Sequence, residues 1–220
     1  MLIAGILGSE GRLQTTNIIT SIFTTNGEKV SVIDSVDMLN LDSMRIKEYI
    51  RELKKNNVDL LLLKAEPADV DRFLSDELQF DILIYTDKTE NSADSEKAEY
   101  ANKFKRVFSL MAEKGVAIVN VDDNELIRLL QGLKHRFITY GFNTKASVTT
   151  SSIGDSVSKG GFICCLQRSI PSRDGKIIEP QEYKLHLDAG EYDSHNVLAA
   201  ASFAIVNGID LNHLNENHLM

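Results

Sequence analysis

The sequence opens on Leu2-Ile3-Ala4-Gly5-Ile6-Leu7, an apolar run that leads directly into Gly8-Ser9-Glu10-Gly11-Arg12-Leu13-Gln14-Thr15-Thr16. The run predicts a buried strand, the two glycines predict a tight loop, and Thr15–Asn26 is the helix expected to follow. Free backbone N–H groups and the helix dipole converge where such a loop enters a helix, so the unit is suited to bind an anion. A structural turn without any ligand explains the two glycines equally well.

The alternation of strand and helix continues as far as Tyr140 and predicts a mostly parallel sheet with crossover helices. The expected strands are Leu2–Leu7, Lys29–Ile33, Val58–Leu63, Asp81–Tyr85, Val116–Val119 and Arg136–Tyr140. The expected helices between them are Thr15–Asn26, Ser43–Asn56, Ala68–Leu74, Glu96–Lys114 and Asn124–Leu130. Asp42-Ser43 can cap the second helix, and Gly115 is expected to end the fourth.

The pattern changes after Tyr140, because the next segments read as β-structure separated by turns with no helix between them. These segments are Ala146–Ser152, Gly161–Leu166 and Glu182–Leu187. A helix over Ser194–Asn207 follows, with Gly208 as its stop, and the polar stretch 212–220 is expected to fray. We therefore expect an α/β fold in a single domain over residues 1–220. It is a doubly wound, mainly parallel sheet with a small antiparallel β extension at about 146–188.

Composition excludes several classes of partner. The net charge is −8 and no basic block occurs, so neither a nucleic acid nor an anionic membrane is expected as a partner. The first residues carry no basic segment and are too few for a signal or membrane span. Cys164 and Cys165 are adjacent and point to opposite faces of a strand, which disfavours a disulfide. Free cysteines are typical of the cytoplasm, where we expect this protein.

Five stretches, taken in order, give the chain a family resemblance that spans about residues 2–210. The glycine loop resembles the G-T-N-G-K-T-T loop of Mur ligases, which use ATP to join amino acids to the peptidoglycan precursor. The others are similar to the family's F-T-N, I-N-A-D-D, I-T-Y-G and H-N-x-x-N-A-L-A motifs. They are Ile82–Asp87, Ala117–Asp123, Phe137–Phe142 and Ser194–Ala201. The tripeptide synthetase branch is the closest match. The resemblance implies the fold of the ATP-binding central domain.

Several positions to which the resemblance assigns catalysis carry other residues here. Arg12 and Leu13 stand where the family has a Lys for the terminal phosphates and a Thr for Mg²⁺. Lys64 stands where a Glu holds Mg²⁺, and Ser92 stands where the family has a metal-binding His. A cation in place of a carboxylate repels a divalent ion, and leucine cannot ligate one. We therefore expect no metal site and no requirement for Mg²⁺.

Other features of the family are kept in part. The carbamoylated Lys of the tripeptide synthetases aligns with Phe104, although a one-residue gap would place either Lys103 or Lys105 there. At the adenine end Asn196 is kept, while the second Asn falls on Ala199. The resemblance also implies a UDP-substrate domain before the central domain and an amino-acid-binding domain after it. This chain covers neither.

Helix capping and the helix dipole can explain the polar residues at the starts of the predicted helices Ser194–Asn207 and Asn124–Leu130. Ser194 or Asn196 can cap the helix that begins there, which accounts for His195 and Asn196 without a ligand. Asp122 and Asp123 precede another helix, where carboxylates offset the dipole.

Three functions follow, and we rank them in order. The first is a degenerate, non-catalytic module that binds a nucleotide or phosphate-type anion, or a protein partner, or forms a homo-oligomer. The second is an ATP-dependent ligase that forms C–N bonds, or its ATP-binding part. The third is a scaffold without a ligand. No catalytic residue and no required cofactor are expected, although the loop is compatible with ATP. The candidate phosphate-binding residues are Gly8, Ser9, Glu10, Gly11, Arg12, Leu13, Gln14 and Thr15, and the adenine-side candidates are His195 and Asn196.

Overall fold

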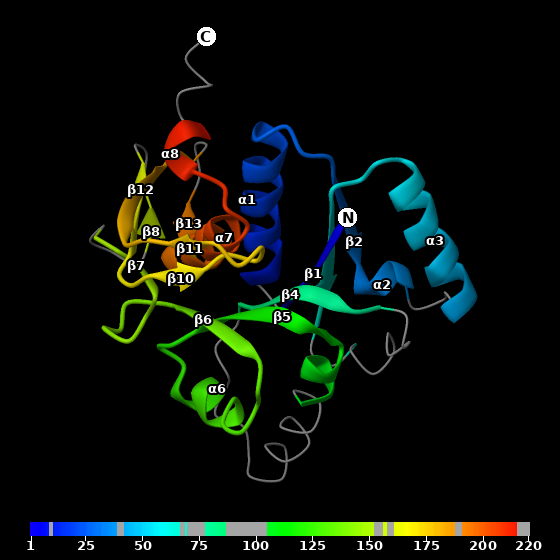
Figure 1. Cartoon of the computed structure of the whole chain (residues 1–220), viewed down its shortest axis with the longest axis horizontal. Helices are drawn as coiled ribbons and strands as arrows, with labels where there is room; N and C mark the ends of the chain where they lie inside the picture. The colour runs from blue at the N-terminus through cyan, green and yellow to red at the C-terminus, as the bar shows by residue number, and fades with distance from the viewer. Residues whose placement is uncertain are drawn as a thin grey trace.

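The computed structural model of the chain describes residues 1–8, 11–38, 42–66, 69, 78–86, 105–151, 156–157, 161–187 and 191–214. Within these residues a nine-stranded sheet forms the centre of the molecule, in the order β12-β9-β7-β6-β5-β4-β1-β3-β2 (Figure 1). Its strands are β1 (Leu2–Leu7), β2 (Val30–Asp34), β3 (Leu60–Ala65), β4 (Phe80–Tyr85), β5 (Met111–Asn120), β6 (Arg136–Tyr140), β7 (Val148–Thr150), β9 (Phe162–Leu166) and β12 (Gln181–Leu185).

The pairs from β2 to β7 are parallel, and β9 and β12 continue the sheet as antiparallel strands. Two small sheets accompany it: β10 (Ile170–Pro171) with β11 (Ile177–Ile178), and β8 (Ser156–Val157) with β13 (Tyr192–Asp193). The predicted parallel sheet with an antiparallel extension is therefore confirmed. Cys164 and Cys165 are both free on β9, one buried and one half-buried.

Helices cover both faces of the sheet, as a doubly wound fold requires. They are α1 (Gly11–Thr25), α2 (Ser35–Met38), α3 (Ser43–Lys55), α6 (Asn124–Leu129), α7 (Ser194–Val206) and α8 (Leu211–Leu214). α1, α7 and α8 share a core with one face of the strands, and α2, α3 and α6 share the core on the other face. The helix stops and starts follow local chemistry: Asp42 caps α3, and Gly208, with a φ of 78°, follows the end of α7.

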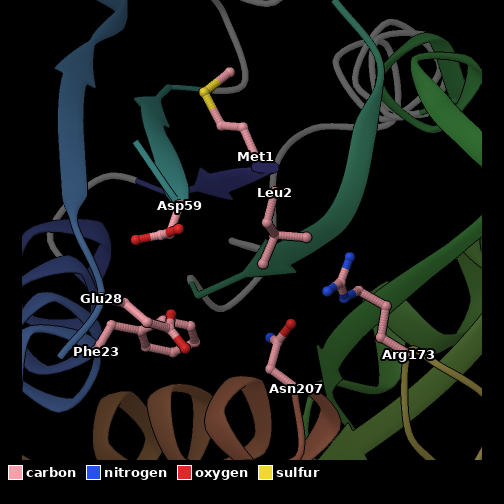
Figure 2. Close-up of a pocket in the computed structure, with 7 residues that line it drawn as sticks. All are labelled: Met1, Leu2, Phe23, Glu28, Asp59, Arg173 and Asn207. Atoms are coloured by element: carbon pink, nitrogen blue, oxygen red, sulfur yellow. The ribbon is translucent and has the colours of Figure 1, made fainter. Parts of the chain in front are cut away.

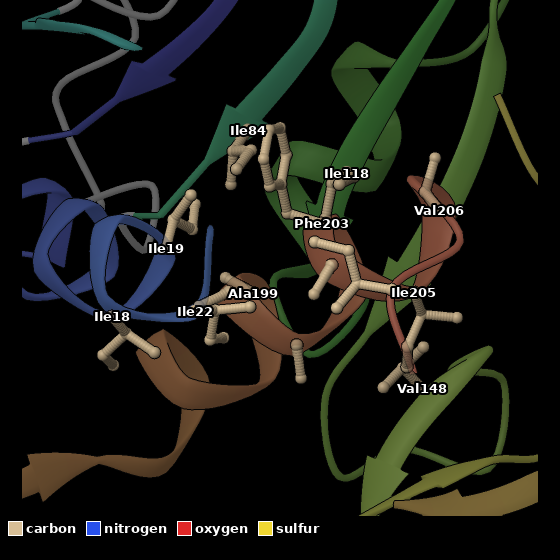
Figure 3. Packing of buried hydrophobic residues seen from close by; sticks show 14 of the residues in the cluster. Ile18, Ile19, Ile22, Ile84, Ile118, Val148, Ala199, Phe203, Ile205 and Val206 are labelled. Atoms are coloured by element: carbon tan, nitrogen blue, oxygen red, sulfur yellow. The ribbon is translucent and has the colours of Figure 1, made fainter. Parts of the chain in front are cut away.

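The layer formed by α1 and α7 positions the site described below. α7 is apolar almost all round and buried along nearly its whole length, so it lies inside the molecule. Figure 3 shows Ile19 of α1 and Phe203 of α7 packed toward Ile84 and Ile118 of the sheet. Phe203 also meets Phe23 at a ring separation of 5.2 Å. The two helices therefore pack as one layer against the sheet.

Two of the predicted elements need correction. The predicted helix Glu96–Lys114 ended too late, because Met111–Asn120 is strand β5 and includes Gly115. Glu113 and Lys114 are polar residues typical of a helix, which is why the sequence predicted one. In the structure Met111 pairs with Phe80 of β4, and the register shifts before Val116. Residues 105–109 are helical as predicted, and 96–104 lie outside the described residues.

The tail was also predicted wrongly in part. Residues 212–214, expected to fray, belong to α8, whose Leu211 and Leu214 are buried in the core beside α1 and α7. Residues 215–220 lie outside the described residues, as does the predicted helix Ala68–Leu74 except for Asp69. Within the described part of the chain, no helix is both long and apolar enough to span a bilayer.

Candidate functional site

The start of α1 approaches the start of α7 closely at the carboxyl end of the parallel strands. β1 ends at Leu7, and α1 begins at Gly11. A Cβ at Gly11 would lie 2.7 Å from Asn196 Oδ1 and 3.1 Å from the Cβ of Thr86, so a side chain there would force these groups to shift. The backbone at Gly8, with a φ of 153°, also favours glycine. The glycines of the loop are thus required for the fold around it, and Ser9 and Glu10 lie outside the described residues.

Gln14 joins the two helix starts through its side-chain amide. Its Oε1 accepts hydrogen bonds from Asp193 N at 2.8 Å and from Asn196 Nδ2 at 3.1 Å. Its Nε2 donates to the Glu191 carbonyl at 3.0 Å. The structure therefore brings the predicted phosphate-side and adenine-side residues together, and Gln14 is the residue that connects them.

The cap of α7 differs from the prediction. Asp193, and neither Ser194 nor Asn196, is the N-cap, and its Oδ1 accepts from His195 N at 2.8 Å and from Asn196 N at 3.2 Å. Ser194 is buried within the first turn of the helix. Because the cap lies one residue earlier, the side chains of His195 and Asn196 are directed to other partners.

His195 pairs with an aspartate that the sequence placed only at a helix start. His195 Nε2 lies 3.0 Å from Asp122 Oδ2, and its ring meets the edge of Phe142 at 4.6 Å. The same carboxylate accepts from Phe142 N at 2.7 Å and Asn143 N at 2.8 Å. Gly141 leaves room for it, since a Cβ there would lie 2.5 Å from Asp122 Oδ2. Asp123 is the N-cap of α6, at the helix start where the sequence predicted a carboxylate that offsets the dipole.

Two cations lie near the phosphate loop, Arg12 in the first turn of α1 and Lys64 near the end of β3, each beside a carboxylate. Arg12 Nη1 donates to the Gly8 carbonyl at 2.7 Å and lies 3.0 Å from Glu66 Oε1. Lys64 Nζ lies 3.1 Å from Asp34 Oδ2, on the neighbouring strand β2. Both cationic side chains are less than a fifth exposed, at 17% and 18%. These pairs hold the positive charges at the edge of the loop.

The pKa of Asp34 reflects this arrangement. Partial burial raises it, but the Val36 N–H, the Lys64 ammonium and the more distant Arg12 guanidinium together lower it below its usual value. Asp34 therefore stays ionised as the counter-ion of Lys64. Among the residues that the structure describes, no group of three His, Cys, Asp or Glu side chains is placed to hold a metal ion. Ser92, the other aligned metal position, lies outside them.

The remaining candidates on α1 differ in exposure. Leu13 is 55% exposed and faces outward, whereas Thr15 is fully buried. The Thr15 hydroxyl has no hydrogen-bond partner within the described part of the chain. Sequence reasoning did not find Thr86, Asp122 and Phe142 as members of this site. Gly141, directly after strand β6, was the one local signal that another group, here the Asp122 carboxylate, approaches the backbone closely.

Comparison with known proteins gives a consistent result. The sequence model of the Mur ligase middle domain matches residues 6–204. A chloroplastic homologue of UDP-N-acetylmuramoyl-L-alanyl-D-glutamate–2,6-diaminopimelate ligase from Arabidopsis thaliana is 23% identical, and the match covers 96% of this chain and 29% of that protein. The ligase of the same name from Caldanaerobacter subterraneus is also 23% identical, with 98% and 45% covered. The chain thus spans less than half the length of these relatives.

Solved structures agree on the fold. A 2,6-diaminopimelate ligase of this type superimposes with a TM-score of 0.70 at 18% identity, over 100% of this chain and 46% of that one. MurF ligase from Thermotoga maritima, solved in complex with ADP, gives a TM-score of 0.57 at 16% identity, over 94% and 46%. From the family match over most of its length, the chain belongs to the Mur ligase middle-domain family.

Proposed function

We propose that this chain is a Mur-ligase-type module that binds nucleotide phosphates or a similar anion without Mg²⁺ and does not itself form a C–N bond. The observation that carries the proposal is the pair of cations near the phosphate loop, one on α1 and one on β3. Lys64 stands beside Asp34, and Arg12 stands between Glu66 and the Gly8 carbonyl. Positive side chains here take the place that a divalent ion needs.

Electrostatics disfavour Mg²⁺ at this position. Mg²⁺ requires an octahedral shell of oxygen atoms, usually including one or two carboxylates. The Asp34 carboxylate is already neutralised by an ammonium group 3.1 Å away, and that group would repel the ion. Phosphoryl transfer depends largely on metal and lysine charges that stabilise the transition state. Without a place for the metal, the main support for catalysis is missing.

An anion has several partners at the loop that need no metal. α1 directs the positive end of its helix dipole toward the loop. Arg12 adds a guanidinium that can hold a phosphate through two hydrogen bonds. Glu66 is the partner an incoming anion would displace, because its side chain is 50% exposed and is readily solvated when released. Nucleotides are the favoured class because the MurF ligase of similar fold is described with ADP.

The alternative is an ATP-dependent ligase, or its ATP-binding part acting with a partner. It is favoured by the extent of the family match and by Asn196, which Gln14 holds beside the loop. The two proposals differ in one observable. The alternative requires ATP turnover that depends on Mg²⁺, whereas the first proposal predicts binding without turnover.

The test is calorimetric titration of ADP and of inorganic phosphate, with EDTA and no added metal, together with an assay of ATP hydrolysis. We expect binding in the micromolar-to-millimolar range, about −8 to −4 kcal/mol. Arg12→Gln should weaken it about tenfold through loss of a charged contact. Arg128→Gln is the matched control, because Arg128 is exposed on α6 and pairs only locally with Glu125. Hydrolysis above a boiled control, or affinity unchanged in Arg12→Gln, would contradict the proposal.

A further inference from the structure

A cavity of about 330 Å³ lies at the opposite end of α1 and α7 from the phosphate loop. It forms where the amino ends of β1 and β3 meet the hairpin that carries β10 and β11 (Figure 2). Leu2 and Phe23 supply apolar surface, and four polar side chains surround it. These are Glu28, Asp59, Arg173 and Asn207. They come from four separate segments of the chain, so no sequence motif marks the cavity.

The charges of this cavity lie on opposite sides. Figure 2 shows Asp59 and Glu28 on one side and the Arg173 guanidinium on the other. In the described part of the chain, no ion pair joins Arg173 to either carboxylate. Asp59 Oδ2 accepts from Lys29 N at 2.8 Å, and Glu28 Oε1 accepts from Asn26 Nδ2 at 3.3 Å. The two sides thus face each other across open space, in contrast to the contact pairs at the phosphate loop.

The fold holds these groups in place. Arg173 N donates to the Val206 carbonyl at 2.8 Å, which fixes the hairpin to the end of α7. Asn207 Nδ2 donates to the Phe203 carbonyl at 2.8 Å. The carboxyl ends of α1 and α7 both border the cavity, the first beside Glu28 and the second beside Arg173. The dipole of α1 therefore adds negative potential on the side of the carboxylates.

Glu28 lacks full compensation for its charge. Burial raises its pKa and Asp59 adds to the rise, while the Asn26 hydrogen bond and the Arg173 charge oppose it. A positive group placed between Glu28 and Asp59 would reverse this balance. On the other side, Arg173 offers donors for a carboxylate.

We infer that this cavity binds a small zwitterion, with its ammonium end against Glu28 and Asp59 and its carboxylate end against Arg173. The body of the ligand lies between these groups, beside Met1, Leu2 and Phe23. A volume at the lower end of the range for ligand pockets, about 300–1,000 Å³, suits a molecule between an amino acid and a dipeptide in size. This inference is independent of the phosphate site, which lies at the other end of the same helices.

The test uses ligands that differ in one charge. γ-Aminobutyrate and glycylglycine are titrated and followed by protein NMR, beside N-acetylglycylglycine and glycylglycinamide, each of which lacks one charged end. We expect saturable binding of at least one zwitterion, weakened about tenfold or more when either end is blocked. A response to glycylglycine alone assigns a peptide, and a response to γ-aminobutyrate alone assigns a single amino acid. Binding of the blocked ligands with equal affinity would overturn the inference.

Two variants locate the site. Arg173→Gln and Glu28→Gln should each weaken the zwitterion about tenfold, without changing the affinity for ADP. Lys176→Gln is the matched control, because Lys176 lies on the same hairpin with an 84% exposed side chain. Equal affinity of Arg173→Gln and Lys176→Gln, in proteins with unchanged circular dichroism, would refute the assignment. The absence of zwitterion binding to folded wild-type protein at about millimolar concentration would refute it as well.

Discussion

The two ends of the α1–α7 layer differ in polarity although the same helices form both. At one end the helix amino termini meet, with the cations Arg12 and Lys64 each in contact with a carboxylate. At the other end the helix carboxyl termini border a cavity in which Arg173 is separated from Glu28 and Asp59. Helix direction alone makes the first end favourable to anions and the second favourable to cations.

At the phosphate-loop end, some features lie in the part of the chain that matches the family, and others are residues particular to this chain. The approach of Gly11 to Asn196 lies within the segment that matches the Mur ligase middle domain. The cations are particular residues at positions where the family resemblance leads one to expect other side chains. Their contact pairs neutralise charge internally, so binding at the loop requires exchange of partners, whereas binding in the cavity requires none.

Phe203→Ala should have the largest effect, because Phe203 is fully buried and contacts Phe23 across the layer. We expect a loss of about 3–5 kcal/mol in the free energy of unfolding, from the lost burial and the cavity created. Urea denaturation measures it, with Phe203→Leu as a milder control. Because the same layer forms both ends, binding of ADP and of the zwitterion should weaken together. A decrease in the free energy of unfolding below about 1 kcal/mol would contradict this packing.

Gly11→Val should affect one end only. A side chain there would collide with Asn196 Oδ1 and Thr86, so the starts of α1 and α7 must separate. We expect about 1–3 kcal/mol of destabilisation and a loss of ADP binding of tenfold or more. Zwitterion binding measured on the same protein should remain. Unchanged affinity for ADP would show that the close approach does not shape the anion site.

Gln14→Ala tests the link between the same helix starts. Three hydrogen bonds are removed, to Asp193, Asn196 and Glu191. At about 0.5–1.5 kcal/mol each, and with partial replacement by water, we expect a net loss of about 1–2 kcal/mol. Thermal and urea unfolding measure it, and Asn17→Ala, on the exposed face of α1, is the control. Equal stability of the two variants would show that the hydrogen bonds of Gln14 do not stabilise the junction of the two helix starts.

Lys64→Gln should have the smallest effect, and one that depends on pH. Asp34 has a lowered pKa in the folded state, so its contribution is present above the unfolded value of about 3.9 and lost as pH falls through the folded value. Because a quarter of the Asp34 side chain is exposed, the pair contributes only about 0.5–1 kcal/mol near pH 7. The stability difference from wild type, followed by urea unfolding, should shrink on acidification. A difference that grows instead would contradict the assigned pair.

Sequence reasoning reached the fold more completely than the site. Strand–helix alternation predicted the parallel sheet because each buried strand carries an apolar run, and Arg136–Tyr140 was predicted to the residue. It failed at Met111–Lys114, where the pairing of Met111 with Phe80 overrides helix-like composition. Local signals describe a segment well, and they fail where a distant strand decides the conformation.

At the site, the structure places Gly11 beside Asn196, two residues that the family resemblance had assigned only to separate sides of a nucleotide site. The resemblance could not find the Asp193 cap, the Gln14 bridge or the Asp122–His195 contact. Each of these depends on side-chain direction after folding, and caps compete among neighbouring polar residues. The cavity was beyond sequence analysis for a stronger reason, since its residues share no motif and meet only in the folded chain.

The central claim is that Lys64 replaces a metal at the phosphate loop. The most direct test is calorimetric titration of ADP into wild type and Lys64→Glu, each with EDTA and with Mg²⁺ in excess over ADP. For wild type, we expect the two dissociation constants to agree within about threefold, because the ammonium excludes the ion. For Lys64→Glu, which restores an acidic ligand beside Asp34, we expect Mg²⁺ to tighten ADP binding relative to EDTA. Wild-type protein that binds ADP only with Mg²⁺ would contradict the account.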